Sequence, residues 1–408
     1  MPNLIVQLQQ NTPMIHFQAE EAGATLRATA VKPALDRFLI EICKNEPNIE
    51  SWMHDTTNKA FDYRMTFRAE AWAKVENEAL KKYNNAQMPY FAKSDGVMCS
   101  ESVTMTIISA KSDMVGKIRE NIAAFFLLHN FGVRATKGYG SFQVVSTQMV
   151  SIDKKPVAVT CTEKAIWEAV KKLSGEDAIQ AAVKPSGEFE PNLYKLPSGY
   201  GSWGAALADI NSIYAQMKSG RNHPFRDDLY QPAVLSKLYR GVKRNLHGEK
   251  WWIKQNFDAI RRYAESCKHH PDAVQSETPY REQNARFLRA MLGLTDSYKF
   301  DIHGRDANYV VDIADNPKDQ EKGIIQRFAS PLIFKPVRIG GQLQVYILVK
   351  RIPDVMFDRE FAFKYGGHTE KLKTPNQKEF SLVGFLDFIA GNDGGRLINK
   401  VEAGGEGV

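Results

Sequence analysis

A glycine-rich segment with two cations, FGVRATKGYGSF at residues 131–142, is the most informative part of the chain. Glycine permits positive φ angles and a close approach of backbone to ligand, and exposed N–H groups beside Arg134 and Lys137 suit a phosphodiester backbone. The same pattern also fits a turn whose cations are only solvated. The spacing matches neither G-x-x-x-x-G-K-[ST] nor G-x-G-x-x-G, so it does not support these nucleotide-binding motifs.

A second basic feature lies in the middle of the chain. Between Lys218 and Lys268 there are twelve Lys or Arg residues and five Asp or Glu residues, so this stretch holds the whole net charge of +7. A helix predicted over 232–245 would carry Lys237, Arg240, Lys243 and Arg244 beside an apolar face. Cations with interleaved aromatic rings suit a groove for single-stranded RNA, although the rings also fit a hydrophobic core.

The histidines and cysteines give weaker signals. His16 and His129 could form an acid–base pair, because an imidazole titrates near neutrality. The alternative places His129 at the C-terminus of a helix and His16 partly buried beside Phe17. The four cysteines stand far apart and no residues have the spacing of a metal site, so we expect neither a metal nor another cofactor.

The first 150 residues have the periodicities of a β-α-β-β-α-β unit. The predicted elements are a strand at 3–9, a helix at 31–42, strands at 62–69 and 102–108, a helix at 113–129 and a strand at 142–149. This order is ferredoxin-like, the pattern shared by many RNA-binding domains of the RRM type. It does not fix a function by itself.

The rest of the chain indicates a helical region and then a second α+β unit. We predict helices at 163–173, 203–217, 232–245, 252–266 and 282–292, strands at 326–335 and 343–351, and a last helix at 378–390. The predicted fold class is therefore α+β, with a helical insertion before a second α+β unit whose strand order cannot be read from the pattern. Its predicted parts are the domain 1–152, a mainly helical basic region 153–325, and the rest of the second domain, 326–408.

Length and composition are those of an ordinary globular protein. The chain has 408 residues, of which 43% are hydrophobic and 25% charged, which argues against a disordered or fibrous chain. No stretch approaches the ~18 consecutive apolar residues of a membrane span, and the N-terminus lacks the pattern of a signal peptide. We expect a cytoplasmic protein without a membrane partner.

Three motifs in order resemble the RAMP superfamily of CRISPR-associated proteins. The segment 132–141 resembles the glycine-rich loop of these proteins. Thr12-Pro13 with 23–32 (GATLRATAVK) resembles their entry into the first helix, and 327–335 (RFASPLIFK) resembles the "R-x-x-SPL" strand of the large two-domain RAMP subunit of the type III-B Cmr complex. Pro33 stands where the family usually has glycine, and Thr136 replaces a cation in the loop.

The resemblance implies two ferredoxin-like domains with a helical insertion. It also implies a non-catalytic subunit that grips CRISPR RNA, target RNA or both within a ribonucleoprotein of antiviral defence, beside other Cmr-type subunits. The alternatives are a metal-independent endoribonuclease that processes CRISPR RNA with His16 or His129, and a ferredoxin-like scaffold that binds only proteins. The candidate RNA-binding residues are Arg27, Lys32, Arg134, Lys137, Gly138, Tyr139, Gly140, Ser141, Lys237, Arg240, Lys243, Arg244 and Arg327.

Overall fold

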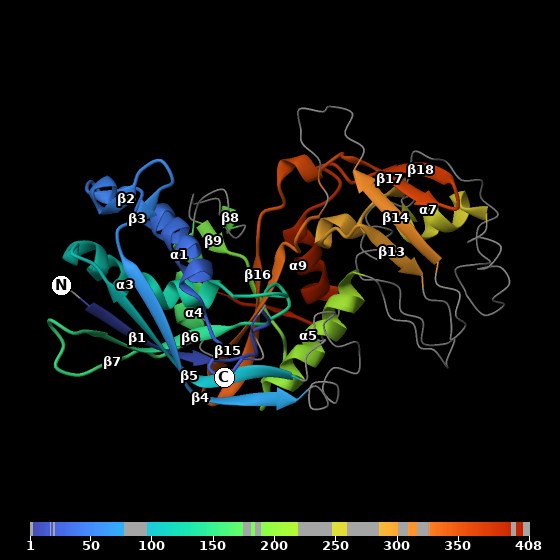
Figure 1. Ribbon diagram of the computed structural model, residues 1–408. Coiled ribbons are helices and arrows are strands. Elements are labelled where there is room, and N and C mark those ends of the chain that lie inside the picture. Colours follow the sequence, from blue (N-terminus) through green and yellow to red (C-terminus); the bar gives the residue numbers. More distant parts are fainter. Residues whose placement is uncertain are drawn as a thin grey trace. The chain divides into compact units, whose positions relative to one another are not determined.

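The computed structural model of the chain forms two compact units (Figure 1). Unit 1 comprises Met1–Asn211, Leu332–Arg351 and Gly395–Val408, and unit 2 comprises Ser212–Pro331 and Ile352–Gly394. The described residues are 3–16, 18, 21–76, 96–173, 181–183, 189–218, 247–258, 285–300, 309–315, 325, 327–392 and 397–402. Within them, no helix combines the length and the apolar character needed to cross a bilayer.

The first sheet of unit 1 has the predicted ferredoxin-like topology. Its elements are β1 (Asn3–Gln10), α1 (Ala28–Ile42), β4 (Arg64–Glu76), β5 (Gly96–Ile108), α3 (Ser112–Leu128) and β6 (Phe142–Met149), followed by the short edge strand β7 (Val157–Ala158). The antiparallel sheet has the strand order β4-β5-β1-β6-β7. The predicted β-α-β-β-α-β order is therefore confirmed.

Alternating burial along β1 shows why the sheet forms. Leu4, Val6 and Leu8 are fully buried, and the residues between them are half-buried. A strand places alternate side chains on opposite faces, so one face of β1 enters the core. Helices α1 and α3 contribute their apolar stripes to that core, where the rings of Phe38 and Phe125 lie 5.6 Å apart between centroids.

A second sheet in unit 1 has the order β15-β16-β10-β19. Its strands are β10 (Leu193–Lys195), β15 (Leu332–Ile339), β16 (Gln342–Val349) and β19 (Asn399–Lys400). Along the chain, helix α5 (Trp203–Lys218) follows β10 and helix α9 (Leu382–Asn392) precedes β19. The same β-α-β-β-α-β order with the same strand order thus occurs twice, which confirms the α+β class and the prediction of two ferredoxin-like domains.

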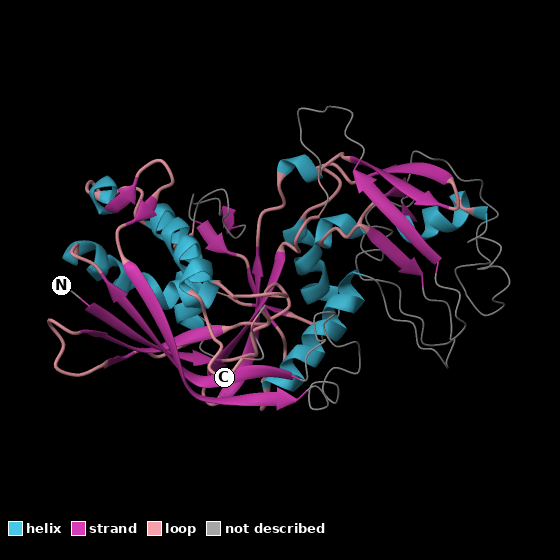
Figure 2. Cartoon of the chain, in the orientation of Figure 1, coloured by secondary structure: helices cyan, strands magenta, loops and turns pink. Residues whose placement is uncertain are grey.

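Shorter elements complete both units (Figure 2). In unit 1 they are η1 (Ile49–Trp52), β2 (Met53–Asp55), β3 (Ala60–Phe61), α4 (Glu163–Lys171), β8 (Ala181–Val183) and β9 (Phe189–Pro191). In unit 2 they are β11 (His247–Gly248), α7 (Glu249–Asn256), β12 (Ala285–Arg286), η4 (Arg289–Leu292), β13 (Ser297–Phe300), β14 (Tyr309–Asp315), η6 (Asp354–Met356), β17 (Glu360–Tyr365) and β18 (His368–Lys373). The larger sheet of unit 2 has the order β13-β14-β17-β18.

Some sequence predictions for the second half were wrong. The predicted helix 282–292 contains β12 and a 3-10 turn in its described part, because Phe287, Leu288 and Met291 are buried without a regular helical stripe. The described parts of 153–325 contain helices α4, α5 and α7 together with short strands, among them β8 to β14. The predicted helix 232–245 lies outside the described residues. The predicted domain boundaries at 152 and 325 stay a prediction. The hairpin β15–β16 pairs with β10 in unit 1.

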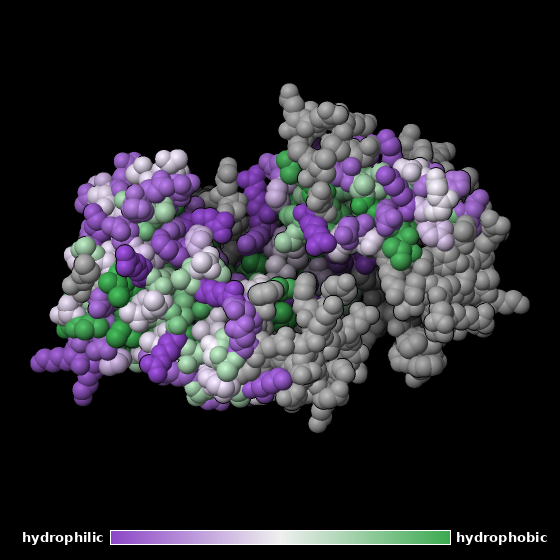
Figure 3. All heavy atoms as spheres, viewed as in Figure 1, coloured by the Kyte–Doolittle hydropathy of each residue, from purple (hydrophilic) through white to green (hydrophobic). Residues whose placement is uncertain are grey.

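Exposed aliphatic side chains mark one edge of the first sheet. On the face shown in Figure 3, hydrophobic (green) side chains gather over β1 and β7 in unit 1. Val145, Val150, Ile152 and Val157, on β6, β7 and their connection, are among the exposed large apolar residues. The opposite edge of this sheet is β4.

Candidate nucleic-acid interface

The glycine-rich loop, residues 131–142, is hydrogen-bonded along its length. Val133 N donates to Ile15 O (2.7 Å), and Gly140 N donates to Pro13 O (2.8 Å). Ser141 N donates to the Thr12 hydroxyl (3.0 Å), whose own proton goes to Gly138 O. The N–H groups of Lys137 and Gly138 donate to carbonyls within the loop. The expectation of exposed N–H groups is therefore wrong for these residues. The donors of Val133, Gly140 and Ser141 bind the loop to the chain after β1.

The glycines of the loop serve close packing. Gly140 has a φ of +65°, and a Cβ there would lie 1.8 Å from Phe131 O. Gly138 has a φ of +84°, and its Cβ would lie 2.8 Å from a methyl carbon of Ile210. Both positions need glycine for conformation and for space, because protein atoms already occupy the room that a ligand would need.

Polar side chains join the loop to β15. Asn130 Nδ2 donates to Ala135 O and to Phe334 O, both at 2.8 Å. Ser141 Oγ and Asn11 Nδ2 both donate to Pro336 O. The loop thus fastens the second sheet to the first within unit 1.

Lys335 lies at the centre of this junction and is fully buried. Its Nζ donates to His129 O (2.8 Å), Asn130 Oδ1 (3.1 Å) and Phe142 O (3.1 Å). Burial lowers the pKa of Lys335 to about 7. Three acceptors match the three hydrogens of an ammonium, whereas a neutral amine would leave one acceptor unsatisfied, so the geometry favours the charged form.

Only part of the predicted loop site reaches solvent. Tyr139 is 2% exposed, Ser141 is fully buried, and Lys137 Nζ is buried 5.9 Å from the Phe334 ring centroid. Arg134 is half-buried and has a φ of +58°. A positive φ is uncommon outside glycine and marks a position worth examining for function. Arg134 is therefore the cation of the loop that a solvent-borne ligand can meet.

Of the two candidate RNA-binding residues near the N-terminus, one faces solvent and the other is used within the fold. Arg27 is exposed and donates to the Gln18 side chain. Lys32 is used within the fold: its Nζ lies 2.8 Å from Asp36 Oδ2, 2.8 Å from Phe61 O and 4.0 Å above the Tyr63 ring. Burial and the Arg27 charge lower the pKa of His16. Its Nδ1 accepts from Gln18 N (3.1 Å), so the ring of the neutral form carries its proton on Nε2.

His129 packs among aromatic rings. Its ring centroid lies 4.5 Å from that of Phe125 and 6.1 Å from that of Phe38, and its Nδ1 donates to Phe125 O (2.8 Å). Burial lowers the pKa of His129 to about 4, helped by the charges of Lys350, Lys335 and Arg37. The imidazole is therefore neutral at physiological pH and has a structural place in the junction.

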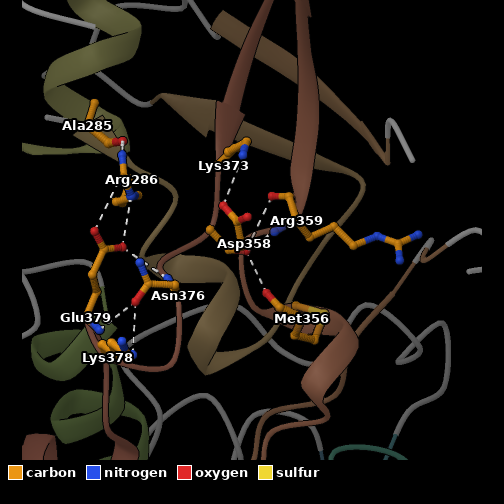
Figure 4. Close-up of polar contacts among 10 residues, drawn as sticks. Ala285, Arg286, Met356, Asp358, Arg359, Lys373, Asn376, Lys378 and Glu379 are labelled. Atoms are coloured by element: carbon orange, nitrogen blue, oxygen red, sulfur yellow. Dashed lines mark hydrogen bonds and ion pairs between the residues drawn. The ribbon is translucent and has the colours of Figure 1, made fainter. Parts of the chain in front are cut away.

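The remaining candidates lie in or near unit 2. Arg327 is exposed and pairs with exposed Asp296 at 3.2 Å, a type of ion pair that contributes little to stability. Lys237, Arg240, Lys243 and Arg244 lie outside the described residues. Figure 4 shows other cations of unit 2 engaged in the fold: Arg286 makes two hydrogen bonds to Glu379 (3.0 and 3.1 Å), and Lys373 donates to Asp358 (3.1 Å).

Sequence reasoning missed two exposed cations near His129. Arg37 on α1 and Lys350 after β16 are both exposed and both act electrostatically on the His129 ring. They are far apart in sequence and follow no motif, so only the junction at β15 brings them close. In the described part of the chain, no group of three or more His, Cys, Asp or Glu residues could hold a metal ion.

Comparison with known proteins gives two matches to family models. Residues 1–221 match the Cmr1 N-terminal domain, and residues 230–402 match the Cmr1 C-terminal domain. No curated protein sequence matches the chain.

Among solved structures, the crystal structure of apo Cmr1 from Pyrococcus furiosus is 12% identical, with 98% of each chain covered and a TM-score of 0.46. A chain of the type III-B Cmr-beta complex with cognate target RNA, AMPPnP and ssDNA is 11% identical, with 95% of this chain and 98% of that chain covered and a TM-score of 0.39.

We predict that Gly140→Ala destabilises the protein by about 3 kcal/mol or more, because it adds an atom against Phe131 O at a positive φ. Urea unfolding followed by circular dichroism measures the effect. Gly341→Ala is the matched control, since Gly341 has a φ of +85° but no atom within 4 Å of its Cβ. Its expected cost is only about 1 kcal/mol. Equal losses in the two variants would contradict the close packing of the loop.

We also predict that His129 makes stability depend on pH. Its pKa is about 4 in the folded protein and 6.5 as the ordinary value, so the unfolded chain binds more protons between these limits. The stability that the neutral His129 ring contributes is fully present above pH 6.5. It is lost as the pH falls, and at pH 4 the free energy of unfolding is lower by about 3 kcal/mol. Urea unfolding at pH 7 and pH 4.5 should show a smaller pH effect in His129→Gln than in the wild type. An identical pH effect in both would refute the assignment.

Proposed function

The chain belongs to the Cmr1 family of RAMP proteins, and on this premise we propose that it is an RNA-binding subunit of a type III-B CRISPR ribonucleoprotein in antiviral defence. Its partners under this proposal are CRISPR RNA, target RNA or both, and other Cmr-type subunits. Its contribution is to hold RNA through charge and shape. The family matches at both ends of the chain support the assignment.

The main support for RNA binding is the conformation and the surroundings of Arg134. Its backbone is left-handed, its side chain is half-buried, and within the described residues no carboxylate pairs with it. Arg27 is a second exposed arginine of unit 1, held by a neutral amide and by no acid among the described residues. Guanidinium groups that are not neutralised by the protein are suited to phosphate oxygens.

The surroundings of His129 favour binding over cleavage. A general acid or base works best with a pKa near the operating pH, and burial holds this ring well below it. Its Nδ1 proton is already engaged by Phe125 O. The neighbouring cations Arg37 and Lys350 fit an anionic partner at the surface, which is consistent with a gripping role.

We predict that Arg27→Ala with Arg134→Ala weakens RNA binding by the full chain without unfolding it. If each arginine contacts one phosphate of a single strand, the slope of log K against log salt becomes shallower by about 1.4. Filter binding of labelled single-stranded RNA at several salt concentrations measures this slope, and use of guide and target sequences tests which RNA is preferred.

The matched control is Lys164→Ala with Lys171→Ala, two exposed lysines on α4 whose loss removes the same charge. The control should keep the wild-type slope. An unchanged slope in the double arginine variant would remove Arg27 and Arg134 from the interface. A wild-type chain that binds no RNA, alone or in its assembled complex, would refute the proposed function.

A further inference from the structure

Strand β4, the edge strand of the first sheet, carries a regular row of exposed side chains. From Arg64 onward, Met65 is buried and Phe67 and Ala69 are half-buried, whereas the residues that alternate with them are exposed. The exposed row consists of Arg64, Thr66, Arg68, Glu70, Trp72 and Lys74. Alternate residues of an antiparallel strand lie about 6.8 Å apart on one face, a spacing comparable to that of successive phosphates in an extended nucleic-acid strand.

The charges of the row favour an anion. Arg64 and Arg68 are exposed, and neither forms an ion pair within the described part of the chain. The one acid of the row is Glu70, whose Oε1 lies 3.5 Å from the Thr104 hydroxyl. Arg64 and Arg68 outnumber Glu70 in the part of the row from Arg64 to Trp72, so the charge of this part complements a phosphodiester backbone.

The row also contains an exposed aromatic ring. Trp72 is 47% exposed and is the one aromatic residue among the large hydrophobic side chains exposed in the described structure. Ala71, directly before it, has a φ of +48°, an uncommon conformation for a residue with a Cβ. A Cβ built on Gly23 would lie 3.9 Å from Trp72 Nε1, so the ring lies beside the segment that leads to Arg27. An accessible indole next to cations is the combination that stacks on nucleobases.

The neighbouring strand adds hydrogen-bonding groups to the same face. Thr66 pairs with Thr106, Arg68 with Thr104, and Glu70 with Ser102. Directly paired residues point to the same side of a sheet, so these hydroxyls lie next to the charged row. At the opposite sheet edge, near β7, hydrophobic side chains are exposed (Figure 3), and the large ones among the described residues are the aliphatic Val145, Val150, Ile152 and Val157.

We propose that the β4 row is a binding site for single-stranded RNA, in which Arg64 and Arg68 contact phosphates and Trp72 stacks on a base. The site rests on the proposed function and adds to it a surface distinct from the glycine-rich loop. It takes an unpaired, extended strand, because only unstacked bases present their faces to a protein ring.

The test measures binding of a fluorescently labelled, mixed-sequence single-stranded RNA to the full chain across a range of salt concentrations. Trp72→Ala should weaken binding about 10-fold, and Trp72→Phe should retain most of the affinity because it keeps a ring. Arg64→Ala with Arg68→Ala should make the salt slope shallower by about 1.4. RNA should quench the tryptophan fluorescence of the wild type more than that of Trp72→Phe.

The matched control is Lys154→Ala with Lys155→Ala, which removes the same charge from the connection before β7, at the opposite edge of the same sheet. It should keep the wild-type salt slope, and all variants should keep the wild-type circular dichroism and melting temperature, since the altered residues are exposed. Wild-type RNA binding that is unaffected in the β4 variants, or affected equally in the control, overturns the β4 site and leaves the proposed function standing. Variants that lose subunit assembly but not RNA binding overturn it in favour of a protein contact. A wild type that binds no RNA overturns both proposals.

Discussion

The Lys335 ammonium and its three oxygen acceptors are the interaction on which unit 1 depends. The side chain comes from β15, and its acceptors belong to the end of α3, to Asn130 and to the first residue of β6. A buried charge is tolerated only when its hydrogen bonds are satisfied, so the three acceptors must hold their positions. Two sheets that lie far apart in the sequence are thereby fixed to each other.

This constraint explains the arrangement of the glycine-rich loop. The loop lies between the first sheet and β15, so its N–H groups, its tyrosine and its serine are used in packing and hydrogen bonding. A phosphate would have to displace these contacts to reach the glycines. The loop nevertheless holds Arg134 at the surface in a left-handed conformation. Under the proposed function, the loop's role in recognition is to position one cation, and the exposed β4 row offers a longer surface of the same charge.

Much of the first domain could be predicted from sequence because its signals are local. Alternation along 142–149 and the apolar stripe of 113–129 correspond closely to β6 and α3. Strands β10 and β19 were missed because three and two residues are too short to show a period. The second ferredoxin-like topology therefore became readable only from strand pairing.

The candidate site was harder to predict because burial depends on distant partners. The sequence around Lys137 and Tyr139 has the composition of an exposed loop, and only the approach of β15 shows that both are packed. Lys335 stands in an apolar strand and gives no local sign of its three acceptors. Trp72 lies on a strand that extends beyond the predicted one, so neither its exposure nor its register with Arg64 and Arg68 was foreseen.

We propose that RNA meets the exposed surface of unit 1 and not the interior of the glycine-rich loop. Ultraviolet cross-linking of the full chain to single-stranded RNA, followed by mass spectrometry of the adducts, tests it most directly. We expect an adduct at Trp72 and none at Tyr139, whose ring is enclosed. An adduct at Tyr139 without one at Trp72 would contradict it.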